Sequence, residues 1–222
     1  MAAGIEKHFQ PVPPLQYAPP TKRELAKMEH LDWVPASILN FSQEFNGFRV
    51  RWTTTAEQQA RYTERAQRGL RQARGRIEFK RLQDMYGSWE GVVYFADQPL
   101  DNARLRAFKV VDMFSDEAAV GLFHDAQQEA QLYLCVFGEE EPAPLGVDFE
   151  GYLQLLTLTL GHVYWPYLLR DVHQHFTLQP AEPYTAPTNA SAQQCAAELS
   201  ALLPDFSLDA FVACYDQVRL RR

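Results

Sequence analysis

Three short apolar segments in the middle of the chain constrain its fold more than any other feature. They are rich in β-branched and aromatic side chains and cover residues 108–114, 119–123 and 131–137. Only brief polar segments, residues 115–117 and 125–128, separate them. Apolar runs of this length joined by short polar turns are typical of strands that pair antiparallel with their sequence neighbours. We therefore expect an antiparallel meander, preceded by shorter strands at 77–79 and 92–95.

A helix is predicted directly after this meander, in the sequence DFEGYLQLLTLTLG at residues 148–161. Asp148 is a suitable N-cap, Glu150 is favourable in the first turn, and Gly161 can end the helix. One face carries apolar side chains at helical spacing: Phe149, Tyr152, Leu153, Leu156 and Leu160. Leu155 and Leu158 lie off that face, so more than one side of the helix should be buried. A strand over 156–160 is the alternative, but the capping residues favour a helix.

Further helices are predicted on both sides of the strands. Thr21 and Glu24 form a capping box for a short helix with Leu25 and Met28 inward, and Ser191 and Ser207 should cap two helices near the C-terminus. A helix that begins near Pro35 should end at Asn46-Gly47, where glycine can adopt a left-handed conformation. Its buried side should carry Ile38, Leu39 and Phe45. The alternation of apolar and basic residues at 48–52 then predicts a half-buried strand.

These segments predict an α+β protein in which helices flank a mostly antiparallel sheet. With 222 residues, 46% of them hydrophobic, the chain can bury one substantial core. Residues 1–20 hold five prolines and should be extended. We expect the main domain at 21–176 with an inserted Arg-rich helix at 55–74, a linker at 177–190, and a C-terminal helical pair at 191–222.

Charge and cysteine content narrow the class of partner. The net charge of −7 argues against nonspecific binding to nucleic acid or anionic membranes, and it suits a basic protein partner. No apolar run reaches the roughly 18 to 20 residues that a membrane span needs. Cys135, Cys195 and Cys214 are odd in number and lack metal-like spacing. We interpret them as reduced, buried thiols, which indicates a cytoplasmic protein.

The sequence offers few groups for catalysis, and we expect neither an enzyme nor a cofactor. No GxSxG motif and no glycine-rich phosphate loop is present. Asp171, His173 and His175, with His162 nearby in sequence, are the best metal-ligand candidates. However, residues two apart on a helix point in different directions. We therefore expect no metal site and a partly exposed helix end there, with a metal-dependent hydrolase as the remote alternative.

Several segments resemble the SUKH superfamily (Smi/Knr-like). VPASILNFSQEFNGF at residues 34–48 is similar to the opening helix of that family, with its proline start and Asn-Gly stop. FKVVDMFSDEAAVGLFHD, AQLYLCVFGEEEPAP and LGVDFEGYLQLL are similar to its closing strands, acidic loop and final helix. The resemblance covers roughly residues 20 to 165. The Arg-rich helix and the segment after Gly161 depart from the family pattern.

The resemblance implies a function by binding. Bacterial SUKH proteins are mostly immunity proteins that neutralise a polymorphic toxin, often a nuclease or deaminase. Fungal relatives are non-catalytic scaffolds or regulators of cell-wall synthesis, which gives the alternative function. A nucleic-acid-directed toxin is usually basic, so we expect acidic residues to contact it: Asp116, Glu117, Glu139, Glu140 and Glu141. The basic stripe of Arg61, Arg65 and Arg68 is the next candidate, although a solvated helix face explains it as well.

Overall fold

The computed structural model of the chain describes residues 9–29, 31–55, 60, 73–95, 103–124 and 130–220. The chain divides into two compact units. Unit 1 consists of Met1–Pro14, Val50–Arg76 and Gly151–Arg222, and unit 2 of Leu15–Arg49 and Ile77–Glu150. No helix in the described part of the chain is both long enough and apolar enough to cross a membrane.

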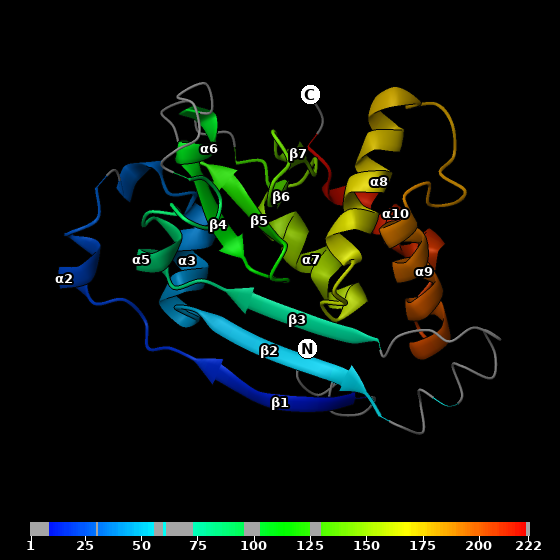
Figure 1. The fold of residues 1–222 in the computed structure, drawn as a ribbon, viewed down its shortest axis with the longest axis horizontal. Coiled ribbons are helices and arrows are strands. Elements are labelled where there is room, and N and C mark those ends of the chain that lie inside the picture. The colour runs from blue at the N-terminus through cyan, green and yellow to red at the C-terminus, as the bar shows by residue number, and fades with distance from the viewer. Residues whose placement is uncertain are drawn as a thin grey trace. The chain divides into compact units, whose positions relative to one another are not determined.

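An antiparallel meander forms the centre of unit 2 (Figure 1). Each strand pairs with the next in the sequence, in the order β4 (Phe108–Asp112), β5 (Ala118–Phe123), β6 (Tyr133–Val136) and β7 (Ala143–Pro144). The end of β3 pairs antiparallel with β4 through Phe79 and Asp112. The predicted meander and the α+β class are therefore confirmed.

Strand β5 is the most deeply buried part of this sheet. All six of its residues are buried, and it pairs with a neighbouring strand on each side. The ring of Phe108 lies over Gly121, where a Cβ atom would come within 2.6 Å of the ring and 2.2 Å of a backbone oxygen. Only glycine fits at that position, because any side chain would displace the neighbouring strand.

Short helices complete unit 2: α2 (Lys22–Leu25), the 3-10 helix η1 (Leu31–Trp33), α3 (Ala36–Glu44), α5 (Leu82–Met85) and α6 (Ala103–Ala107). The predicted capping box at Thr21 and Glu24 is present. Gly47 has φ +88°, as expected for the end of α3. The expected burial of Phe45 is wrong, because α3 ends at Glu44 and the Phe45 ring is exposed. Phe41 instead packs against Phe79 and Phe149, with ring centroids 5.2 Å away in each case.

Two predicted elements differ from the structure. The strand expected at 92–95 is wrong, because residues 91–93 form a turn in which Gly91 has φ +80° and Val92 is exposed. The Arg-rich helix predicted for 55–74 falls mostly outside the described residues, as do Arg61, Arg65 and Arg68. Its predicted end is wrong, since Arg74 begins strand β3 (Arg74–Phe79).

Unit 1 contains parts of three strands, β1 (Phe9–Gln16), β2 (Phe48–Thr54) and β3, together with four helices near the C-terminus. Strand β2 enters it at Val50 and has the predicted alternation of buried and exposed side chains. The Trp52 ring lies over Gly75 of β3, and its indole nitrogen donates a hydrogen bond to the Leu160 carbonyl at 2.7 Å. The helices are α7 (Phe149–Thr159), α8 (Trp165–Leu178), α9 (Ala190–Leu202) and α10 (Leu208–Val218). Strand β1 neighbours β2, in the Pro-rich segment predicted to be extended.

Helix α7 confirms the helix predicted at 148–161 and excludes the strand. Tyr152, Leu155 and Leu156 are fully buried, so the helix does bury more than its predicted face. Leu158 is exposed. Gly151 permits close packing against α10, because a Cβ atom there would lie 3.1 Å from Val218.

Side-chain caps set the starts of the last two helices. Ser207 caps α10 as predicted, since its hydroxyl accepts a hydrogen bond from the Ala210 amide. Helix α9 begins one residue before the predicted cap Ser191, and Asn189 caps it instead. Its amide oxygen accepts hydrogen bonds from the backbone amides of Ser191 and Ala192. Asparagine is as good an N-cap as serine, so the sequence pattern alone does not separate the two.

Candidate functional site

The five acidic residues predicted to contact a partner lie in two turns at one end of the β5–β6 pair. Ala118 at the start of β5 pairs with Val136 at the end of β6. Beyond this pair, the Phe137 amide donates a hydrogen bond to the Glu117 carbonyl at 2.8 Å. The structure therefore brings together two sequence segments about twenty residues apart, and all five side chains are exposed. We call these residues the acidic edge: Asp116, Glu117, Glu139, Glu140 and Glu141.

Local hydrogen bonds shape both turns of the acidic edge. The Ser115 hydroxyl accepts hydrogen bonds from the backbone amides of Glu117 and Ala118 and donates one to the Ala118 carbonyl. In the second turn the Glu139 amide donates to the Val136 carbonyl, and Gly138 has φ +94°. Serine and glycine thus shape the backbone, and the neighbouring acidic residues are exposed. Grouped exposed carboxylates of this kind attract basic surfaces, and salt screens the attraction.

Unit 1 contains a buried pair of ionisable side chains, His162 and Glu198. His162 lies between α7 and α8 and forms an isolated bridge with Gly75, and Glu198 lies on α9. The His162 Nε2 and Glu198 Oε2 atoms are 2.6 Å apart, and the two side chains are 0% and 2% exposed. The Gln194 side-chain amide donates a hydrogen bond to the other Glu198 oxygen at 2.8 Å.

Hydrogen bonds to the imidazole indicate which ring nitrogen of His162 donates to Glu198. The Tyr164 backbone amide donates to His162 Nδ1 at 3.2 Å. Because a backbone N–H can only donate, Nδ1 carries no proton, and the imidazole is neutral with its proton on Nε2. That proton is donated to Glu198 Oε2. Both ring nitrogens of His162 are engaged, so the ring holds the carboxylate in place and is not available as a base.

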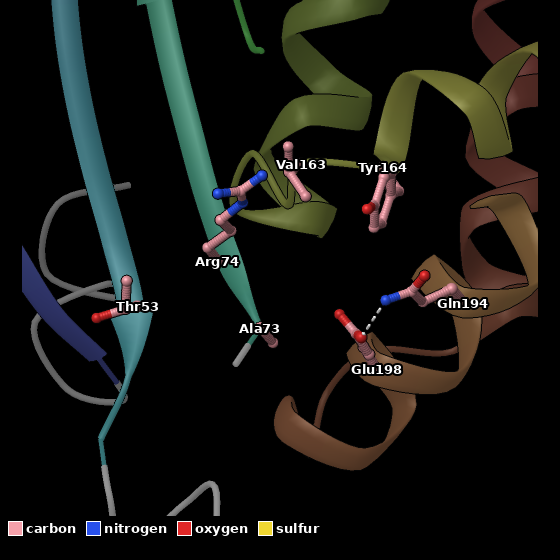
Figure 2. Close-up of a pocket in the computed structure, with 7 residues that line it drawn as sticks. All are labelled: Thr53, Ala73, Arg74, Val163, Tyr164, Gln194 and Glu198. Atoms are coloured by element: carbon pink, nitrogen blue, oxygen red, sulfur yellow. Dashed lines mark hydrogen bonds between the residues drawn. The ribbon is translucent and has the colours of Figure 1, made fainter. Parts of the chain in front are cut away.

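A pocket of about 320 Å³ lies beside this pair. Four segments line it (Figure 2). They contribute Thr53 on β2, Ala73 and Arg74 at the start of β3, Val163 and Tyr164 before α8, and Gln194 and Glu198 on α9. The sequence reasoning missed this site. A signal was present, since Glu198 lies on α9 between the apolar residues Cys195 and Leu199, both fully buried.

The residues considered as metal ligands are separated by other contacts. In the part of the chain that the structure describes, no three His, Cys, Asp or Glu side chains are grouped to hold a metal ion. His173 Nδ1 lies 2.7 Å from the Tyr215 hydroxyl, and His175 Nε2 lies 2.9 Å from the Glu182 carbonyl oxygen. His162 is paired with Glu198 as described above.

Asp171 is not at a partly exposed helix end, so that expectation is wrong for this residue. It is 5% exposed and accepts hydrogen bonds from the Tyr184 hydroxyl, the Thr188 hydroxyl and amide, and the Asn189 amide. Burial alone would raise the pKa of Asp171, but these hydrogen bonds together lower it below its ordinary value. Asp171 thus ties the segment before α9 to α8.

The cysteines are thiols without a disulfide partner in the structure. Cys135 lies inside β6, and burial raises its pKa to about 11, so the reactive thiolate is scarce at neutral pH. Burial likewise raises the pKa of Cys195. The predicted burial is confirmed for Cys135 and Cys195 but is wrong for Cys214, which is only partly buried.

Comparisons of the chain with known protein families, with curated protein sequences and with solved structures found no match.

Proposed function

We propose that the protein acts by stoichiometric binding of a basic protein partner through the acidic edge. The observation that carries the proposal is the gathering of five exposed carboxylates, from two separate segments, at one end of β5 and β6. Such a surface speeds association with a basic partner, and close charge pairs across an interface have coupling energies of about 1.5 to 7 kcal/mol. Binding needs no catalytic group.

The resemblance to SUKH proteins suggests the kind of partner. We propose an immunity protein that neutralises a polymorphic toxin, a nuclease or deaminase with a basic substrate-binding surface. The bound acidic edge would cover that surface and exclude nucleic acid from it. We place the protein in the cytoplasm, in keeping with its three unpaired thiols. A non-catalytic scaffold would use the same surface for a different basic partner.

Charge reversal of the acidic edge tests the proposal. All five carboxylates are changed to lysine, and growth is measured in cells that also express the toxin that the proposal expects to be encoded beside this gene. The wild type should restore growth and co-purify with the toxin. The variant should lose protection, and its association with the toxin should slow, because repulsion replaces attraction.

A matched control separates local charge from net charge. It reverses five exposed carboxylates outside the edge, which changes the net charge by the same amount: Glu29, Glu90, Glu182, Asp205 and Asp209. This control variant should still protect. If both variants protect, the interface lies elsewhere. Equal loss in both would mean that net charge, rather than the edge, controls binding. Protection by the wild type without any complex would indicate enzymatic detoxification, and binding without protection would favour a scaffold.

A further inference from the structure

We propose that the pocket in unit 1 binds a small zwitterion of the amino-acid type. In this assignment Glu198 receives the ligand's ammonium group, and Arg74 receives its carboxylate. The proposal is independent of the acidic edge and of the toxin partner.

The surroundings of Glu198 are the first argument. Its carboxyl group is 2% exposed. Among the described residues, its two oxygens receive one hydrogen bond each, from His162 and Gln194. An ionised carboxylate can accept about four hydrogen bonds, and burying its charge is costly without a cationic partner. Since Glu198 lines the pocket, an ammonium group there would supply the missing charge and up to three donors.

Arg74 supplies the opposite charge in the same pocket. Its guanidinium makes no hydrogen bond or ion pair with the side chains that the structure describes, and it is exposed. A guanidinium offers five donors in a planar fork that matches a carboxylate. The backbone of Arg74 is anchored, because its carbonyl accepts a hydrogen bond from the Val163 amide at 3.0 Å. The pocket therefore has a cationic side chain on an anchored backbone.

The remaining lining fits a short ligand with one side chain. Thr53 and Tyr164 also line it, and Ala73 and Val163 contribute apolar surface (Figure 2). The volume of about 320 Å³ is near the lower end of small-molecule pockets, which favours a ligand of amino-acid size over a nucleotide. A simple anion would be repelled by Glu198, and a simple cation by Arg74. Only a ligand with both charges satisfies both groups.

Binding is tested by titration calorimetry of the full chain with the twenty standard amino acids. At least one should bind and raise the melting temperature, since a ligand selective for the folded state stabilises it. Two probes made from that amino acid provide the ligand controls, namely the amine without its carboxylate and the acid without its amino group. Each should bind at least about tenfold more weakly, a loss of about 1.4 kcal/mol.

Substitutions in the pocket provide the second arm. Arg74→Gln and Glu198→Gln should each weaken binding at least about tenfold, whereas Arg51→Gln on the neighbouring strand should not. Arg74 is exposed, so its variant keeps the test valid if Glu198→Gln fails to fold. The proposal is overturned if no amino acid binds, if the amine or the acid binds as tightly as the amino acid, or if Arg74→Gln binds like the wild type.

Discussion

The acidic edge and the His162–Glu198 pair use the same functional group in opposite surroundings. At the acidic edge, five acidic residues are exposed on turns that serine and glycine shape. In unit 1, the Glu198 carboxyl group is 2% exposed and hydrogen-bonded to an imidazole and an amide. The difference teaches that burial, rather than the functional group itself, decides how strongly the fold depends on a carboxylate.

The two regions should differ in how much a lost carboxylate interaction changes the free energy of unfolding. Solvated carboxylates keep their hydration, so an exposed charge pair contributes only about 0 to 1 kcal/mol to stability. A buried carboxylate has lost its hydration and depends on the groups that replaced it. His162 also lies in the loop that hydrogen-bonds to β3, through Gly161 and Val163. Breaking the pair should therefore disturb the loop, α9 and the start of β3 together.

The largest expected effect comes from removing the imidazole. His162→Leu leaves Glu198 buried with one donor fewer and should cost about 3 to 5 kcal/mol in the free energy of unfolding, measured by urea denaturation. The double variant with Glu198→Leu should recover part of that loss, because no buried charge is then left unpaired. A loss below about 1 kcal/mol in the single variant would mean that Glu198 is solvated, and the comparison would fail.

Asp171 sharpens the comparison, because it is buried among neutral donors. Asp171→Asn should cost about 1 to 3 kcal/mol at neutral pH, since four hydrogen bonds lose their charged acceptor. The pKa of Asp171 is lowered in the folded state, so its contribution is complete above the ordinary aspartate pKa of about 3.9. That contribution disappears as the pH falls through the lowered pKa.

The pH dependence of stability therefore identifies the Asp171 effect. Melting curves of wild type and Asp171→Asn, recorded from neutral to acid pH, should converge below about pH 4. The exposed Asp205→Asn should follow the wild type throughout and serves as the control. A constant gap between Asp171→Asn and wild type at all pH values would contradict the charged role of Asp171.

The sequence predicts best what repeats along the chain. The meander at 108–137 and the helix at 148–161 are confirmed because several apolar residues agree on one period in each. Errors arise where a single residue decides the outcome. Phe45 was expected on the buried side of α3, but the helix ends at Glu44 and Phe45 is exposed. The residues at 91–93 form a turn because Gly91 adopts a positive φ, although the surrounding composition favours a strand.

The two candidate sites differ in the same way. The acidic edge follows from the sequence because its carboxylates flank strands whose pairing is predictable, so their proximity is predictable too. The pocket does not, because it joins Arg74, Tyr164 and Glu198, whose proximity depends on how α9 packs. The helical pattern predicts which face of α9 carries Glu198. It does not predict that His162, 36 residues earlier, is the hydrogen-bond partner of Glu198.

The smallest expected effect lies at the acidic edge, where the comparison predicts almost no cost to the fold. Glu117→Gln and Glu140→Gln should each change the free energy of unfolding by no more than about 0.5 kcal/mol, because exposed substitutions away from packed contacts rarely do more. Any change should shrink at high salt, which screens exposed charges over roughly 3 Å at 1 M. Urea denaturation at low and high salt measures both points, with Glu198→Gln as the buried counterpart. A loss above about 1 kcal/mol at either edge position would mean that the carboxylate holds its turn in shape, and loss of partner binding in the lysine variant would then reflect a damaged surface.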